Sequence, residues 1–432
     1  LTAQPQSTTL GGGVQPFQRW TYGEINDGAA LRGIAGQTLK ARLDNQLDVP
    51  TTLHWHGLRV SKGMDGVSGM FHSPLVDPKQ AFTYDVPLRD PGTHWFHSHH
   101  DSLNQIARGL YGPLVVENPE EPKLFELMMV LDDWTVSGPD PQNYSIDWTK
   151  LKPSLAWGHA GVKGRVLTIN GSVRPRLDLA FSGATRLRML NAATARVFRP
   201  SFENLEAWVV ALDGYGCTPF RLDDPVFFGP GQRMDVLLVP APFGTPEIFL
   251  GENLFGKGTG FEFSLGVETS LTLAEALPAF RPYQPPEVRP AQRKTLRMSE
   301  PYRDDQRGAG ILNGQWQAWE SLVKDHNYWL FNDVADNSLG PLFAGRVGET
   351  IELRMFNDSA THHVMHFHGQ HVQIIENAKV PHEVGSFRDS LTLEAWAEVK
   401  LALKLDRPGL WPLHCHILGH QVSGMWTYYE VA

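Results

Sequence analysis

The sequence predicts an all-β protein built from three Greek-key β-sandwich domains. Three observations favour this class. One segment pattern recurs three times, its copies alternate apolar and polar residues with a period of two, and Pro-Gly turns precede many of the runs. With 41 Gly and 31 Pro in 432 residues, the chain has the turn content of many short strands. A chain of this length is expected to form two or three domains, each able to bury a core.

The first recurring pattern joins a strand to a pair of histidines. From Gly36 and from Gly348, nine residues lead to Asn45 and Asn357, and nine more lead to a His-x-His-Gly sequence. These pairs are His54/His56 and His366/His368. The outer two copies of the repeat therefore carry imidazoles at the same position.

The middle copy of this pattern keeps the strand and loses the histidines. It runs from Gly183 to Asn191 with the same alternation, and Pro200 and Phe202 stand where histidines would fall. We expect a domain with the same scaffold and no metal ligands there.

A second pattern follows a Pro-Gly turn. The segment PGTHWFHSHH from Pro91 aligns with PGLWPLHCHI from Pro408, and PGQRMDVLLV from Pro230 is a weaker echo in the middle of the chain. The alignment places His97 on His414, Ser98 on Cys415 and His99 on His416. We therefore expect metal ligands in the outer two domains only.

Domain boundaries are expected near residues 118 and 285. Domain 1 would cover residues 1–118, domain 2 residues 119–285 and domain 3 residues 286–432. The proline-rich stretch from Pro278 to Lys294 is typical of a semi-rigid linker. Helical periodicity is weak, apart from a short turn expected at residues 104–107.

Charge and hydropathy exclude several classes of partner. The net charge of -9 argues against nucleic acid, which favours a basic face. No apolar run reaches the roughly 18 residues of a membrane span. The chain starts at Leu1 without the features of a signal peptide, so we expect a mature chain whose leader has been removed. Oligomeric state cannot be predicted.

The number of His-x-His sequences indicates a metal centre. Eighteen histidines placed at random would give about one such sequence, and this chain has four. Residues i and i+2 of a strand point to the same side, so each pair offers two imidazoles to one site. Eight imidazoles suit copper, zinc, iron or nickel, whereas calcium and magnesium favour oxygen ligands.

The last segment, HCHILGHQVSGM, adds sulfur to the donor set. Strand alternation should point Cys415 to the side opposite His414 and His416, so one tripeptide would contact two centres. A cysteine, two histidines and a weak axial methionine form a blue-copper electron-transfer site. The candidates are Cys415, His420, Met425 and a second histidine at position 363, with neighbouring His362 as the alternative.

The segments HWHG, HSHH, HVMHFHG and HCHILGHQVSGM resemble the copper signatures of the multicopper oxidases and occur in that family's order. With the repeats, the resemblance covers essentially the whole chain. It implies three cupredoxin-like domains and four copper ions, one of type 1, one of type 2 and two of type 3. The implied type 1 ligands are His363, Cys415, His420 and Met425. The implied type 2 ligands are His54 and His366, and the type 3 ligands are His56, His97, His99, His368, His414 and His416.

The resemblance also implies a laccase-type activity. A small reducing substrate, such as a phenol, would give single electrons to the type 1 copper through the edge of His420, and electrons would cross by Cys415 to a cluster that reduces O2 to water. Asp65 matches an acid that the family often has beside the cluster, although an aspartate before a glycine is also a common turn residue. Gln421 stands where some bacterial members have a proton-relaying acid, and an amide cannot titrate. Most bacterial members act outside the cytoplasm, so a secreted or periplasmic location is expected.

Three alternative hypotheses for the function have less support in the sequence. A cuprous-ion metallo-oxidase would be favoured by a methionine-rich insert, whereas this chain has 10 scattered Met. A non-catalytic scaffold of the same fold would have lost ligands, and all twelve positions are filled. A two-domain nitrite reductase is disfavoured by the third repeat. The remaining cysteine, Cys217, is expected to be a free buried thiol, and His159 and His326 belong to no motif.

Overall fold

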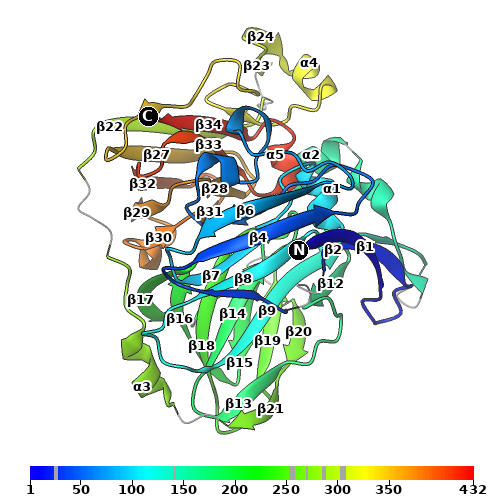
Figure 1. The fold of residues 1–432 in the computed structure, drawn as a ribbon, viewed down its shortest axis with the longest axis vertical. Helices are drawn as coiled ribbons and strands as arrows, with labels where there is room; N and C mark the ends of the chain where they lie inside the picture. Colours follow the sequence, from blue (N-terminus) through cyan, green and yellow to red (C-terminus); the bar gives the residue numbers. More distant parts are fainter. Residues whose placement is uncertain are drawn as a thin grey trace.

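The computed structural model describes residues 1–23, 28–139, 143–152, 154–252, 258–268, 271–284, 289–301 and 308–432. Three groups of sheets follow one another along the chain (Figure 1). The predicted all-β class with repeated cupredoxin-like sandwiches is confirmed. The expected domain boundaries at residues 118 and 285 stay a prediction, and residues 285–288 of the expected linker lie outside the described residues.

The first group has two four-stranded sheets that enclose a core containing Leu43, Trp55 and Tyr84. One sheet has the order β2 (Phe17–Tyr22), β1 (Thr2–Thr8), β4 (Thr38–Asn45), β6 (Ala81–Pro87). The other has the order β3 (Leu31–Ile34), β8 (Tyr111–Glu117), β7 (Gly92–His97), β5 (His54–His56).

The middle group is centred on a six-stranded sheet. Its order is β12 (Val166–Ile169), β9 (Phe125–Trp134), β14 (Thr185–Asn191), β18 (Arg233–Pro240), β16 (Leu205–Leu212), β17 (Tyr215–Arg221). Two smaller sheets accompany it: β15 (Arg199–Glu203), β19 (Glu247–Gly251), β20 (Thr259–Glu262), and β13 (Asp178–Ser182), β21 (Ser264–Glu268). Met189, Val236 and Ile248 are buried in the core of this group.

The last group again has two sheets. One has the order β25 (Leu330–Phe331), β22 (Gln292–Ser299), β27 (Thr350–Asp358), β32 (Glu398–Lys404), β29 (Val372–Asn377), β30 (Phe387–Arg388). The other has the order β26 (Ala344–Gly345), β34 (Trp426–Val431), β33 (Gly409–Cys415), β28 (His363–Phe367), β31 (Ser390–Leu393). Cys415 and Met425 are buried in the core that contains Leu353 and Leu401.

Short elements connect the sheets. Two hairpins are β10 (Val136–Ser137) with β11 (Ser145–Ile146), and β23 (Ala309–Leu312) with β24 (Gln315–Ala318). The α-helices are α1 (Ser102–Ala107), α2 (Leu155–Ala160), α3 (Leu273–Ala276), α4 (Trp319–Lys324) and α5 (Leu418–Gln421). The 3-10 helices are η1 (Lys62–Met64), η2 (Gly69–Phe71), η4 (Trp148–Leu151), η5 (Leu277–Ala279) and η6 (Pro381–Glu383). Helix α1 confirms the short turn expected at residues 104–107.

One asparagine holds the same place in all three groups. Asn45, Asn191 and Asn357 are fully buried at the ends of β4, β14 and β27. Each side-chain amide donates to carbonyls of two different loops, for Asn45 those of Val49 and Val76, each at 2.9 Å. Because an unpaired buried amide is costly, the residue fixes the chain beyond the strand. This shared role explains why the repeat keeps an asparagine where it loses the histidines.

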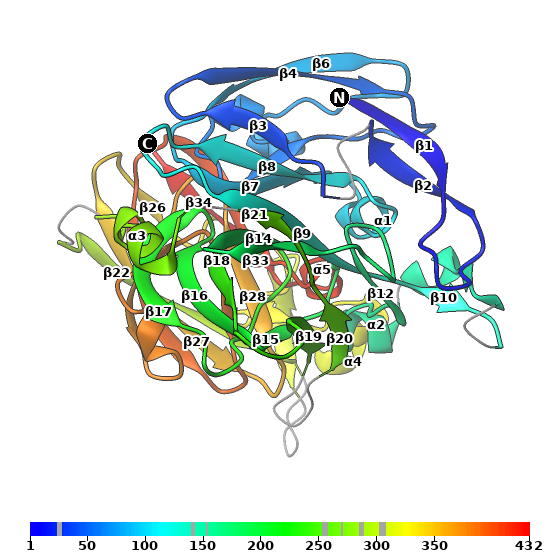
Figure 2. The same cartoon turned by 90° about the horizontal axis from the view of Figure 1, so that it is seen from below.

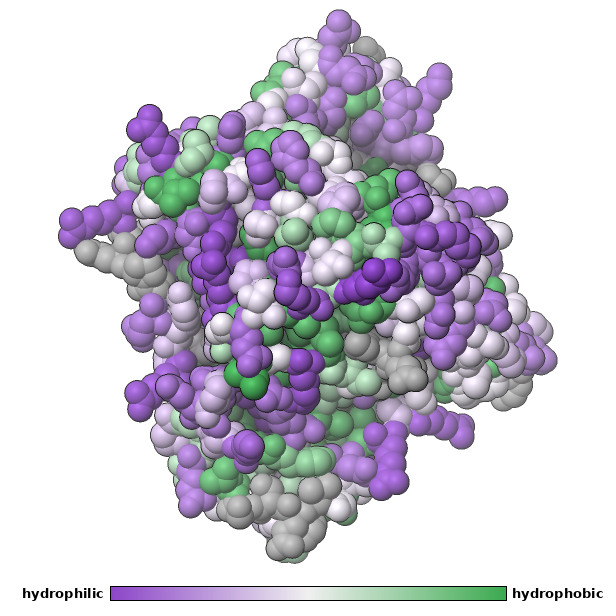
Figure 3. Space-filling view, in the orientation of Figure 1, coloured by the Kyte–Doolittle hydropathy of each residue, from purple (hydrophilic) through white to green (hydrophobic). Residues whose placement is uncertain are grey.

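Each group of sheets contacts the other two. Strand β18 contacts β7, β17 contacts β30, and β33 contacts η1 and η2. Figure 2 shows the blue strands of the first group above the green and orange strands of the other two. The face drawn in Figure 3 mixes hydrophilic and hydrophobic side chains. Among the described residues, no helix is long and apolar enough to span a membrane.

Candidate metal centres

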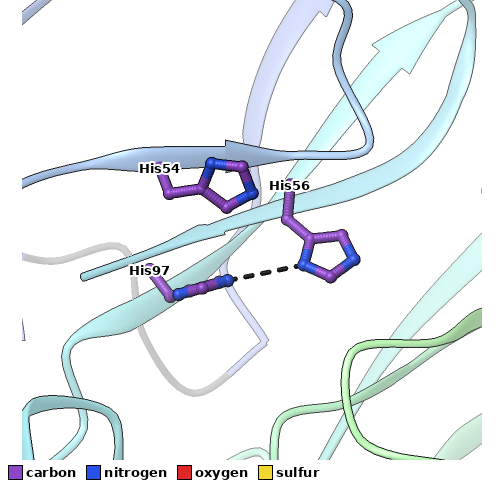
Figure 4. A group of neighbouring side chains, drawn as sticks. All are labelled: His54, His56 and His97. Atoms are coloured by element: carbon purple, nitrogen blue, oxygen red, sulfur yellow. Dashed lines mark hydrogen bonds between the residues drawn. The ribbon is translucent and has the colours of Figure 1, made fainter. Parts of the chain in front are cut away.

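The four His-x-His sequences meet where the first and last groups of sheets come together. His54 on β5 lies opposite His97 on β7, and His366 on β28 lies opposite His414 on β33. Figure 4 shows the rings of His54, His56 and His97 turned toward one another from two neighbouring strands. The structure therefore brings together the eight histidines that the spacing singled out, although the first four are hundreds of residues from the last four in the chain.

The rings approach one another through nitrogen atoms. The Nε2 atoms of His54 and His366 are 3.3 Å apart, and Nδ1 of His56 is 3.4 Å from Nε2 of His97. Nε2 of His414 lies 3.0 Å from that of His368 and 3.3 Å from that of His99. His416 completes the group, with its ring centroid 5.0 Å from that of His56.

The other nitrogen of most of these rings faces a hydrogen-bond acceptor. A carbonyl or carboxylate oxygen can only accept, so the nitrogen that faces it carries the proton. The Nδ1 atoms donate as follows: His54 to the Asp65 carbonyl (2.7 Å), His97 to the Ser98 carbonyl (2.9 Å), His366 to the Asp389 carbonyl (3.0 Å), His368 to the Asp65 carboxylate (2.8 Å) and His414 to the Cys415 carbonyl (3.0 Å). His56 instead donates through Nε2, to the Asp389 carboxylate at 3.1 Å.

These tautomers leave lone pairs facing one another. In the contacts His54–His366, His56–His97 and His368–His414, neither of the two facing nitrogens carries a proton. Lone pairs at such distances repel, and a cation between the rings removes the repulsion. The donor set therefore fits metal ions.

Burial favours the neutral form of most of these imidazoles, which is the form that binds a metal. Burial, and the charges of neighbouring histidines, lower the pKa of His414 to about 3. The same causes hold the pKa values of His97, His99 and His416 well below the usual value. Neither ring nitrogen of buried His416 has a hydrogen-bond partner among the described residues. A metal ion would give that ring a partner.

A second group of donors, the candidate mononuclear centre, contains Cys415. The Nδ1 atoms of His363 and His420 are 3.1 Å apart, and the Cys415 sulfur is 3.7 Å from Nδ1 of His420. Nε2 of His420 donates to the His159 carbonyl. The Ser359 hydroxyl donates to Oδ1 of Asn357, so it accepts from Nε2 of His363 at 3.0 Å. The facing Nδ1 atoms are again both free of protons.

The strand predicted to serve two centres points its side chains toward two separate groups of donors. Cys415 packs beside His363 and His420, whereas its neighbours His414 and His416 face the histidine cluster. Burial raises the pKa of the Cys415 thiol to about 12, so a metal bound there must displace a proton. Met425 is fully buried in the same core, and its backbone pairs with Cys415 at 3.1 Å.

The mononuclear centre is covered. His420 is fully buried, and the carbonyl of His159, in α2, accepts from its Nε2 at 2.9 Å. The buried Trp329 ring packs against the rings of His420 and His363, each at 4.6 Å, and stacks on the half-exposed His159 ring at 5.5 Å. The His420 ring thus lies behind His159 and Trp329, and the expectation that electrons enter through its edge stays a prediction. Sequence reasoning missed His159 because it belongs to no repeat.

Other residues near the motifs lie apart from these donors. The His362 ring packs on Phe227 at 4.6 Å, so the alternative to His363 faces away. Cys217 and Cys415 are both free and buried, as expected. Gln421 follows His420 and is half-buried, and its Oε1 has no hydrogen-bond partner among the described residues.

Comparison with known proteins decides the family. Two family models described as "Multicopper oxidase" match residues 4–121 and 313–432, which together cover more than half of the chain. The chain belongs to the multicopper oxidase family. It is therefore an oxidoreductase that uses O2 and binds copper. The matched residues include the candidate donors of the first and last groups of sheets, which we call the outer units, on either side of the middle unit.

Relatives include multicopper oxidases of several kinds. Multicopper oxidase MmcO of Mycobacterium tuberculosis is 28% identical over 99% of this chain and 85% of its own length. A multicopper oxidase structure from Pseudomonas thermotolerans has a TM-score of 0.80 and 27% identity over 100% of this chain and 98% of its own. Laccase-1 of Thanatephorus cucumeris is 32% identical over 47% of this chain and 38% of its own length. Copper resistance protein A of Pseudomonas syringae is 29% identical over 49% of this chain and 41% of its own length.

Proposed function

We propose that this multicopper oxidase is a laccase-type enzyme with four copper ions. Bound copper would supply one-electron oxidation at the mononuclear centre and reduction of O2 to water at the cluster. The observation that carries the proposal is the set of facing, unprotonated ring nitrogens at both centres. Elemental analysis of copper per chain tests it.

The contacts support one assignment of the candidate ligands to the four copper ions. The type 1 copper would be held by His363, Cys415, His420 and Met425. The type 2 copper would be held by His54 and His366. One type 3 copper would be held by His56, His97 and His416, and the other by His99, His368 and His414. Each type 3 set draws on both outer units, so the cluster would need both.

Peptide bonds connect the two centres. Cys415 is the direct neighbour of His414 and His416, which belong to different type 3 sets in this assignment. A covalent path of a few bonds therefore joins the mononuclear centre to each half of the cluster. We propose this tripeptide as the route for electrons.

Asp65 is proposed to handle protons at the cluster. Its Oδ2 accepts from His368, and its Oδ1 is 3.4 Å from Nδ1 of His54 and has no hydrogen-bond partner among the described residues. A carboxylate with one free oxygen can take up and release a proton beside the site of O2 reduction. Gln421 cannot share this task.

The methionines favour organic substrates over cuprous ion. Soft thioether sulfur is a good ligand for Cu(I), so a cuprous oxidase would be expected to expose methionines. Of the 10 Met in the chain, Met70 is exposed by 40% and Met64 partly, and the others are buried. A phenol assayed without added copper, compared with cuprous ion, separates the two: a larger kcat/KM for cuprous ion would reject the laccase assignment.

The partners follow from this proposal. They would be a small reducing substrate and O2. A secreted or periplasmic location is proposed from the family resemblance, and fractionation of the native host cells would test it.

A further inference from the structure

Asp389, outside every sequence motif, mirrors the role of Asp65. The carbonyl of Asp65 accepts from His54 of its own unit, and its carboxylate accepts from His368 of the last unit. The carbonyl of Asp389 accepts from His366 of its own unit, and its carboxylate accepts from His56 of the first unit. The two aspartates thus make equivalent contacts: each bonds the first histidine of the pair in its own unit and the second histidine of the pair in the other outer unit.

The two carboxylates differ in their freedom. Among the described residues, Oδ1 of Asp65 has no hydrogen-bond partner, whereas both oxygens of Asp389 bind Arg233. Oδ1 of Asp389 accepts from Arg233 at 2.8 Å, from Ser390 at 2.8 Å and from His56 at 3.1 Å. The Asp389 carboxylate is therefore held by more hydrogen bonds than the Asp65 carboxylate.

Arg233 belongs to the middle unit and is fully buried. Its guanidinium has five N–H donors. They reach the carbonyls of Thr93 (3.1 Å), Gly231 (2.9 Å) and Asp213 (3.0 Å) and the two carboxylate oxygens of Asp389. All five donors are used, and the acceptors come from all three units of the chain.

The backbone around this pair is built for close approach. Gly231 has φ +82°, and a Cβ there would lie 3.0 Å from the rings of His416 and His56. Gly57 has φ +88°, and a Cβ there would collide with Arg233 and lie 2.8 Å from the Asp389 carboxylate. Glycine is thus required at both positions for Arg233 and its turn to reach the cluster histidines.

Electrostatics support the same arrangement. Burial raises the pKa of the Asp389 carboxyl, but the charge and hydrogen bonds of Arg233 outweigh burial, and the pKa lies well below the usual value. Asp389 is thus an anion that needs Arg233, because an unpaired buried charge is strongly unfavourable.

We propose that Arg233 and Asp389 form a positioning unit, contributed by the middle and last units, that holds His56 with Nδ1 toward the type 3 copper pair. The inference rests on the ligand division proposed above. The Nε2–H of His56 donates a hydrogen bond to Asp389, which leaves the Nδ1 lone pair facing His97. The middle unit, which has no histidines at the repeat positions, would then act on the cluster through one arginine.

The alternative is that Arg233 serves only to hold the three units together. Arg186 offers a matched control, because it is equally buried in the middle unit and pairs with Asp235 and Glu121. None of its hydrogen bonds or ion pairs described in the structure involves a histidine. A lysine has three donors in place of five, so Arg→Lys breaks the fork at either position while keeping the charge.

The experiment compares wild type, Arg233→Lys, Asp389→Asn and Arg186→Lys after copper loading and desalting. Copper per chain, the near-ultraviolet absorption of the coupled copper pair, the blue absorption of the mononuclear centre and the melting temperature are measured. We expect Arg233→Lys and Asp389→Asn to weaken copper retention at the pair by about 10- to 100-fold, with loss of the coupled-pair absorption. The blue absorption should persist in both variants, and Arg186→Lys should keep both absorptions.

If Arg233→Lys lowers the melting temperature as Arg186→Lys does and keeps the coupled-pair absorption, the arginine is only structural and the proposal fails. Should Arg233→Lys not fold, Asp389→Asn decides: retained coupled-pair absorption rejects the proposal, and its selective loss supports it. A wild type without the coupled pair would instead reject the proposed function, whatever the variants show.

Discussion

Nε2 of His420 donates a hydrogen bond to the carbonyl of His159, so a turn of the middle unit covers the mononuclear centre. Electrons from a substrate must therefore cross α2 or the neighbouring rings. The half-exposed His159 ring, stacked on Trp329, connects this centre to the surface in the structure. A substrate is expected to dock against it.

Replacing His159 by alanine should slow the delivery of electrons. The carbonyl stays, so the tautomer of His420 is kept, and the half-exposed ring is lost together with its 3.2 Å contact to the Glu300 carboxylate. We expect kcat/KM for a phenol to fall by about two- to tenfold, as for one aromatic contact of about 1 kcal/mol. Stopped-flow bleaching of the blue absorption without O2 measures this step. His382→Ala, at an exposed histidine that packs on Phe220, is the control, and an equal effect there would contradict the docking role.

Replacing Cys415 by serine should remove one copper and the blue colour. The hydroxyl is a poor substitute for a thiolate, whereas the histidine cluster keeps its donors. Copper per chain should fall from about four to about three, with the coupled-pair absorption retained. Cys217→Ser serves as the control, because Cys217 is equally buried and contacts no histidine cluster. Loss of colour in that variant would place the mononuclear centre elsewhere.

Replacing Asp65 by asparagine should slow O2 reduction and leave the oxidation of substrate intact. Asparagine can still accept from His368 but cannot take up a proton. We expect kcat to fall by about 100-fold, the lower range for loss of a general acid. Anaerobic bleaching of the blue absorption should proceed at the rate of wild type. Asp85→Asn, at an exposed carboxylate paired with Lys40, should leave both steps unchanged. Unchanged turnover of Asp65→Asn would leave Asp65 as a turn residue.

Acid should destabilise the fold through a buried histidine that is not a candidate ligand. Burial, and then the charge of Arg59, lower the pKa of His371 to about 3, and Tyr215 hydrogen-bonds its Nδ1 at 2.6 Å. The unfolded chain binds a proton below about pH 6.5, and the folded chain does not until about pH 3. This contribution is therefore complete above pH 6.5 and is lost as the pH falls toward 3.

Comparing pH 7.5 with pH 5 isolates this effect. The free energy of unfolding of wild type should drop by about 2 kcal/mol more than that of His371→Gln over this interval, since each pKa unit corresponds to about 1.4 kcal/mol. Denaturant titration of both proteins at the two pH values measures the difference. The same pH dependence in both would contradict the low pKa.

The cluster histidines could be predicted because their signal is local and repeated. Spacing i, i+2 in a strand places two imidazoles on one side, and the repeat then places His54 with His366 across the pseudo-symmetric contact. The same alternation along the strand turns Cys415 away from His414 and His416 and toward the second group of donors. These inferences need no knowledge of how distant loops pack.

Asp389, Arg233 and His159 could not be predicted on the same grounds. Asp65 follows His54 by 11 residues and Asp389 follows His366 by 23, so their matched roles leave no matched spacing. Arg233 had one weak signal, since its segment from Pro230 echoes the turns that precede the other ligands. Helix α2 covers His420 because the middle and last units pack together, and a local sequence pattern does not predict such packing.

Copper per chain tests the central claim most directly. The purified protein is loaded with excess copper, desalted, and assayed by elemental analysis against protein concentration. The account predicts about four copper ions per chain, one at the mononuclear centre and three at the cluster. About one per chain would contradict it, because the facing histidines of the outer units would then hold no cluster able to reduce O2.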